Sequence, residues 1–203
     1  ISCSSDDESD DYYYNLDVAS RTPTTRSANM DGDFSFVGVT GAYDVPKNQD
    51  ECMLYAIISI AAKRHIPITT VEPDGKGGSL TKTHTIGKNG YTASSAYAYV
   101  KGLATSQQWT PCDVSGNPIP DSESYSYTGG AMSPSVAASI AKQSGILQGI
   151  TVYFETYEKL QEYISKDSFK EEHPAGSYII NSESQGHASI GRGVDKNGYV
   201  KYT

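Results

Sequence analysis

The segment Glu51–Arg64, which reads ECMLYAIISIAAKR, constrains the fold more than any other part of the sequence. Its apolar residues lie almost all round a helix axis, and the two bases at its end suit a helix C-terminus. Such a helix needs neighbours on several sides, so we expect it in the middle of a domain. No run of eighteen apolar residues occurs anywhere in the chain, so the sequence predicts no membrane-spanning segment.

The 203 residues are enough for one domain of ordinary size, or for one domain with a tail. Residues 65–91 hold several glycines and two prolines, and we expect mostly loop there. Capping residues and periodicity predict further helices over 92–104, 134–144 and 156–165, and strands over 33–39, 150–154, 177–181, 187–194 and 199–203. Because most helices precede an antiparallel sheet, the pattern predicts an α+β fold.

The net charge of −8 is concentrated in an acidic N-terminal tail. Residues 1–14 carry five acids and no base, so the rest of the chain is close to neutral. We expect residues 1–32 to form a tail and flexible linker, and residues 33–203 to form the folded domain. A chain without clusters of lysine and arginine is not expected to bind nucleic acid.

The three cysteines, Cys3, Cys52 and Cys112, are widely spaced and form no CxxC pair. The sequence therefore predicts no metal site, and it contains no motif for a cofactor. If the protein is exported, one disulfide and one free thiol would be compatible with this set. Cys112 lies in a Pro/Gly/Ser-rich loop, where it is either a bystander or a disulfide partner in an oxidising compartment.

Cys52 lies at the start of the predicted central helix, where the helix dipole and free amides favour a thiolate. A nucleophilic thiolate also needs a base that moves its proton. Of the four histidines, His187 is the best candidate, because it opens a strand directly after a turn, at a sheet edge where a cleft can form. Two plainer interpretations stay open: Cys52 as an inert core thiol, and His187 as a structural residue.

The order of these two segments resembles the papain-like cysteine peptidase superfamily. A cysteine opens a central helix, and late in the chain GHA opens a strand that runs into DKNGYVKY. The resemblance covers roughly residues 45–62 and 150–203. The bacteriocin-processing (double-glycine) peptidases are the closest branch, and the streptopain-like group is second.

This resemblance implies a papain-like form of the α+β class, in which a central N-terminal helix bearing Cys52 packs on a C-terminal antiparallel sheet. It implies that Cys52 is the nucleophile and that His187 is the general base. The backbone amide of Cys52 would form part of the oxyanion hole.

The sequence departs from the family around the cysteine. The family has a glutamine about six residues before the cysteine, where this chain has Pro46, so Gln49 becomes the oxyanion candidate at a different spacing. The Cys-Gly pair common in the family is missing. Asp50 and Glu51 also place negative charge beside Cys52, which opposes thiolate formation.

The third catalytic residue has no obvious match either. The family has Asn or Asp about sixteen residues after the histidine, and here that position is Thr203. If residues 197–198 are the centre of the hairpin turn, Lys196 faces Tyr199. Asp195 would then lie over about 20 Å along the strand from the predicted base. The orienting group is therefore past residue 203, or comes from another segment, or is missing.

Cys3 stands in a context that resembles the lipobox of bacterial lipoproteins. The acidic run after it resembles the surface-export signal of lipoproteins from the Bacteroides group. On this interpretation Ile1 and Ser2 are remnants of a signal, and acyl chains on Cys3 anchor an extracytoplasmic protein to the outer membrane or cell surface. The alternative is a disordered acidic N-terminus with a chance cysteine.

Three functions are compatible with this pattern. The first is a surface-anchored cysteine peptidase or amidase that hydrolyses an extracellular peptide bond, with a peptide or protein as substrate. The second is a catalytically inactive papain-like lipoprotein that binds protein or glycan. The third is a transglutaminase-like acyl transferase, which shares the order of cysteine before histidine.

Overall fold

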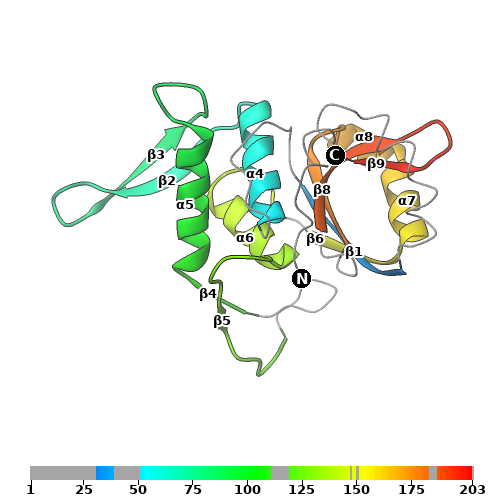
Figure 1. Cartoon of the computed structure of the whole chain (residues 1–203), viewed down its shortest axis with the longest axis horizontal. Coiled ribbons are helices and arrows are strands. Elements are labelled where there is room, and N and C mark those ends of the chain that lie inside the picture. The colour runs from blue at the N-terminus through cyan, green and yellow to red at the C-terminus, as the bar shows by residue number, and fades with distance from the viewer. Residues whose placement is uncertain are drawn as a thin grey trace.

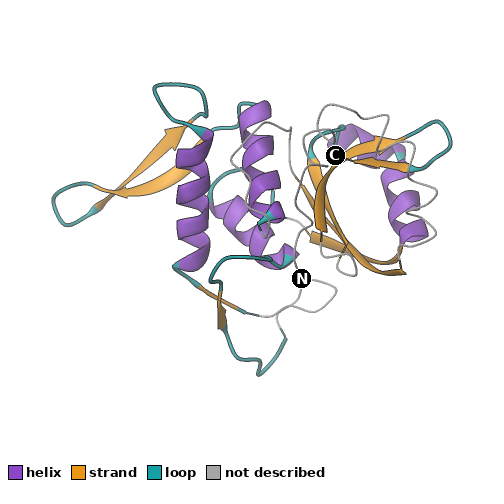
Figure 2. Ribbon diagram, in the orientation of Figure 1, coloured by secondary structure: helices purple, strands orange, loops and turns teal. Residues whose placement is uncertain are grey.

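The structure is a computed structural model, and it describes residues 31–38, 51–110, 119–146, 148–149, 151–182 and 187–202. It combines helices with antiparallel sheets, which confirms the predicted α+β class (Figures 1 and 2). Among the helices of these residues, none has both the length and the apolar content needed to cross a bilayer. The predicted tail, with Cys3, lies almost wholly outside the described residues.

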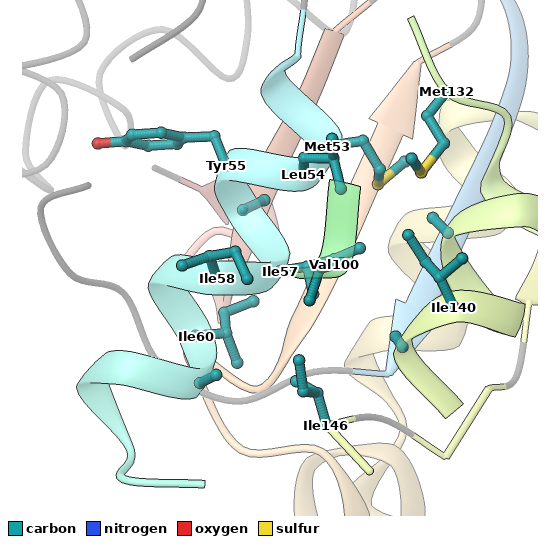
Figure 3. Packing of buried hydrophobic residues seen from close by; sticks show 14 of the residues in the cluster. Met53, Leu54, Tyr55, Ile57, Ile58, Ile60, Val100, Met132, Ile140 and Ile146 are labelled. Atoms are coloured by element: carbon teal, nitrogen blue, oxygen red, sulfur yellow. The ribbon is translucent and has the colours of Figure 1, made fainter. Parts of the chain in front are cut away.

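The apolar segment forms helix α4 (Cys52–Lys63), and ten consecutive residues from Met53 to Ala62 are buried. Helices α5 (Ala93–Thr105) and α6 (Pro134–Gln143) pack against it, and strand β8 (His187–Val194) contacts it from the sheet (Figure 1). Figure 3 shows Ile57 beside Val100 of α5, and Met53 beside Met132. The prediction of a central helix with neighbours on several sides is confirmed.

The main sheet has five strands in the order β6-β1-β7-β8-β9, and every neighbouring pair is antiparallel. Its other strands are β1 (Asp31–Gly38), β6 (Thr151–Thr156), β7 (Tyr178–Ser182) and β9 (Val200–Tyr202). Strand β1 comes from the N-terminal part of the chain, yet it lies between β6 and β7. The sheet is therefore not built from the C-terminal strands alone.

The sheet is covered on both faces. Ile179 belongs to the apolar cluster around α4, whereas its neighbours Tyr178 and Ile180 belong to a second cluster. That second cluster includes Tyr157, Leu160 and Ile164 of α7 (Tyr157–Ser165) and Phe169 of α8 (Asp167–Glu172). Because successive side chains of a strand point to opposite faces, α4 and α7 lie on opposite sides of the sheet.

Local signals placed the helix starts correctly. Thr92 accepts a hydrogen bond from the amide of Ser95, Ser133 from that of Val136, and Thr156 from that of Lys159. Each hydroxyl satisfies an amide that has no partner inside its helix. Gly145, with a φ of 69°, follows α6 and suits the turn that ends the helix.

The expectation of loop over residues 65–91 is wrong. Strands β2 (Ile68–Pro73) and β3 (Ser79–His84) form a hairpin that extends from the helical side of the molecule (Figure 1). Asp74 holds the connection by accepting hydrogen bonds from the amides of Lys76 and Gly78, at 2.7 and 2.9 Å. The glycines and prolines of this segment include those of a hairpin connection, and the β-branched residues of ITTV in β2 were the signal for a strand. A second, shorter pair joins β4 (Gln108–Trp109) to β5 (Tyr125–Ser126).

Strand β8 depends on a glycine. A Cβ atom on Gly191 would lie 1.9 Å from a ring carbon of Tyr178, because the fully buried tyrosine ring covers the glycine backbone. The hydroxyl of Tyr178 accepts a hydrogen bond from the amide of Gly193 at 2.8 Å. The ring is thereby fixed across β8, and residue 191 has no room for a side chain.

We therefore expect Gly191→Ala to lower the free energy of unfolding by about 1–3 kcal/mol, as overpacking does. Gly102→Ala is the matched control, because Gly102 lies in α5 with nothing within 4 Å of its added Cβ. That substitution should stabilise the protein by about 0.5–1 kcal/mol. Urea unfolding of both variants checks this, and equal effects of the two would contradict the packing of Tyr178.

Candidate functional site

Cys52 is the first residue of α4, and its side chain is partly buried. Glu51 is the N-cap, and its side chain makes no capping hydrogen bond. The amides of the first turn are therefore not satisfied by a capping side chain, and the positive end of the helix dipole lies at the sulfur. This local setting is the one the sequence predicted.

The sulfur of Cys52 contacts the backbone at the start of β8. The amide nitrogen of Ala188 donates a hydrogen bond to Cys52 Sγ at 3.4 Å, although the two residues are 136 positions apart. On one side of β8, Ala188 pairs with Asn181 of β7. Strand β9 pairs with β8 further along, at Gly191 and Val194. Cys52 thus contacts the start of β8, before the residues that pair with β9.

This contact brings the start of α4 to the start of β8, as the sequence predicted. His187 is the first residue of β8, pairs with Ser182, and directly precedes Ala188. Its side chain lies outside what the structure describes. The role of His187 as the base therefore stays a prediction, and only its backbone position is established.

The structure also shows a state of Cys52 that the sequence left open: the residue is disulfide-bonded. The other cysteines of the chain, Cys3 and Cys112, both lie outside the described residues. A disulfide sulfur cannot act as a thiolate nucleophile. Nucleophilic attack by Cys52 therefore requires that the disulfide is reduced first. Gln49, the oxyanion candidate, is also outside the described residues.

Glu51 does not act as the uncompensated charge that the sequence suggested. Its carboxylate is only 3% exposed, and Oε1 lies 2.5 Å from Nζ of Lys101 on α5. The ion pair compensates the charge beside Cys52. Sequence reasoning missed Lys101, because a lysine on a helix 50 positions away carries no local signal of its partner.

Asn181 is a second polar residue that the sequence did not single out. It is 9% exposed and pairs with Ala188, the residue that donates to Cys52 Sγ. By the alternation of β7 it shares the face of Ile179, which packs in the cluster around α4. A buried amide at this position is a polar group on the site's side of the sheet.

The hairpin after β8 differs from the prediction by one residue. Asp195, not Lys196, faces Tyr199: the Asp195 amide donates to the Tyr199 carbonyl at 2.8 Å. Within the turn only Gly198 has a positive φ, of 84°, so a three-residue loop replaces the expected two-residue turn. Oδ1 of Asp195 accepts hydrogen bonds from the amides of Asn197 and Tyr199.

Asp195 is therefore a turn residue rather than an orienting group for a histidine. It lies at the far end of the strand that His187 begins. Thr203, the other position considered for this role, lies outside the described residues. No group of three or more potential metal ligands is present among the residues that the structure describes.

Comparison with known proteins adds no assignment: neither the family models, nor the curated proteins, nor the solved structures contain a match to this chain.

We expect Asp195→Ala to destabilise the protein by about 1–2 kcal/mol, because two amides lose their acceptor. The alkylation rate of reduced Cys52 should not change, since Asp195 acts only on the turn. Lys196→Ala is the control, because its exposed side chain should contribute less than about 0.5 kcal/mol. A slower reaction of Cys52 without a loss of stability would contradict this role for Asp195.

Proposed function

We propose that this chain is a papain-like cysteine peptidase or amidase, anchored at the bacterial cell surface through a lipid on Cys3, that hydrolyses an extracellular peptide bond. Reduced Cys52 is the nucleophile, and His187 is the general base. Gln49 and the Cys52 amide stabilise the oxyanion. The substrate is a peptide or protein, and no metal or cofactor takes part.

The hydrogen bond between Ala188 and Cys52 Sγ carries the proposal. It joins a cysteine at a helix N-terminus to the residue that follows a histidine, across two segments far apart in the sequence. A papain-like site needs the nucleophile on one packed unit and its base on another. The arrangement of α4 beside β8, with the rest of the sheet behind, supports that division (Figure 1).

The chemistry begins with reduction, in which a dithiol exchanges with the Cys52 disulfide and leaves a thiol. His187 then takes the thiol proton while the sulfur attacks the substrate carbonyl carbon. The C–N bond breaks, and the leaving amine takes the proton from the imidazolium. Water, deprotonated by the same imidazole, then hydrolyses the thioester and restores the thiol.

The Ala188 amide gives the thiolate a further stabilising contact. A hydrogen bond to the charged form of a group favours that form. Together with the positive end of the α4 dipole, at whose first residue Cys52 stands, it favours negative charge on the sulfur. These groups belong to the backbone, so they act whatever the residue types of their neighbours.

One observation favours a second function, a catalytically silent papain-like lipoprotein that binds protein or glycan. Cys52 is disulfide-bonded, and disulfides persist in the oxidising compartments where surface proteins work. In that case the bond is structural, and the fold serves only for binding. The two functions differ in whether reduced Cys52 is activated.

Alkylation tests the peptidase directly in a variant with Cys3→Ser and Cys112→Ser, which leaves Cys52 as the one thiol of the chain. At pH 7 we expect iodoacetamide to react at least about tenfold faster with Cys52 than with free cysteine, because the site stabilises the thiolate. His187→Ala should remove most of this acceleration. Rates come from mass spectrometry of the intact protein.

The matched control is His65→Asn. His65 is exposed just beyond the other end of α4, and asparagine tolerates its positive φ of 53°. This variant should react like the parent. A parent rate no faster than that of free cysteine, unchanged in His187→Ala, would refute the peptidase.

Hydrolysis separates the two functions. The reduced wild-type protein should cleave an unfolded protein such as casein, and prior treatment with iodoacetamide should abolish the cleavage. Casein that stays intact with a fast-reacting Cys52 would indicate a narrower substrate class. Casein that stays intact with a slow-reacting Cys52 would favour the binding lipoprotein.

A further inference from the structure

Glu51, the residue immediately before the proposed nucleophile, carries a buried carboxylate. Oε1 pairs with Lys101 Nζ, whereas Oε2 is buried and makes no hydrogen bond within the part of the chain that the structure describes. Burying a carboxylate is costly unless it is paired. The ion pair with Lys101 is therefore what allows Glu51 to occupy this position.

A loop after β5 closes over the same pair. A Cβ on Gly129 would lie 3.4 Å from Glu51 Oε1 and 3.9 Å from Lys101 Cε, so the loop backbone lies close against both side chains. Tyr127 donates its hydroxyl hydrogen to the carbonyl of Gly130 at 2.6 Å, not to the carboxylate. Burial first, and then the negative charge of Glu51, raise the pKa of Tyr127, so its phenol is neutral at ordinary pH.

Among the residues that the structure describes, the titratable side chains around this ion pair include Glu51 before α4, Lys101 on α5 and Tyr127 in the loop after β5. His187 begins β8, and only its backbone is described. Of these, Tyr127 stays neutral, and the histidine is the proposed base. Lys101 is then the cation that offsets the charge of Glu51, the residue before Cys52 in the chain.

We propose that Lys101 is a positioning residue of the Cys52 site: its ammonium group neutralises the buried carboxylate of Glu51, the residue immediately before Cys52, and fixes the N-terminus of α4 against α5. This inference rests on the proposed function, because it takes reduced Cys52 as the reactive group. Without the ammonium, a negative charge next to Cys52 opposes the thiolate that the helix dipole favours.

The pH profile of Cys52 alkylation tests the inference in the Cys3→Ser, Cys112→Ser background. Lys101→Met should raise the midpoint of the profile by about one pH unit, and should slow the reaction near pH 7 by up to about tenfold. Lys101→Arg should restore the parent profile, since arginine carries the same charge. A purely structural role would not move the midpoint.

Two further variants keep the test decisive if Lys101→Met is poorly folded. Glu51→Gln combined with Lys101→Met removes both charges, so its midpoint should return towards that of the parent. Lys63→Met changes the net charge equally but at the opposite end of α4, and it should leave the profile unchanged. Circular dichroism confirms that each variant is folded.

The outcomes distinguish this inference from the proposed function. A fast, low-pH reaction in the parent that is unchanged in Lys101→Met overturns the role of Lys101 and leaves the peptidase intact. A parent that reacts like free cysteine overturns the peptidase, and the inference with it. A midpoint raised equally in Lys101→Met and in the double variant also overturns the role, because the charge of Glu51 would then have no part in it.

Discussion

The burial of α4 on every side is the constraint on which the rest of the structure depends. Leu54, Ile57, Ile58 and Ile60 are each fully removed from solvent, and burying a side chain of this kind contributes about 1.5–3 kcal/mol. A helix apolar all round its axis cannot gain this from one neighbour. It therefore needs α5 and α6 on one side and the sheet on the other. These elements all pack against α4, whose apolar side chains form the centre of the core (Figure 3).

The same burial determines where the candidate site lies. Because α4 packs against the sheet, its first residue, Cys52, meets β8 at Ala188. It also explains why Glu51 needs a partner. The N-terminus of a buried helix carries neighbouring side chains into the interior, so an acidic residue there requires a cation such as Lys101.

The disulfide at Cys52 links the chemistry to the compartment. In the proposed peptidase, it makes the reactive sulfur available only after reduction, whereas in the alternative lipoprotein it is a structural bond. Both proposals assume an oxidising environment, in which a disulfide persists. The proposal of a papain-like fold rests on the positions of the Cys52 and Ala188 segments.

The sequence by itself determined much of the local structure, although not the hairpin of β2 and β3. Hydroxyl caps at Thr92, Ser133 and Thr156, the continuous apolar run of α4, and the proline and glycine that bound α6 act over one or two turns of chain, so they can be read without a fold. Only the tertiary structure decided the insertion of β1 between β6 and β7, the pairing of Glu51 with Lys101, and the contact of Cys52 with Ala188. Each of these joins residues far apart in the chain, and such pairings depend on packing and on the shape of the whole core, which no short stretch of sequence encodes.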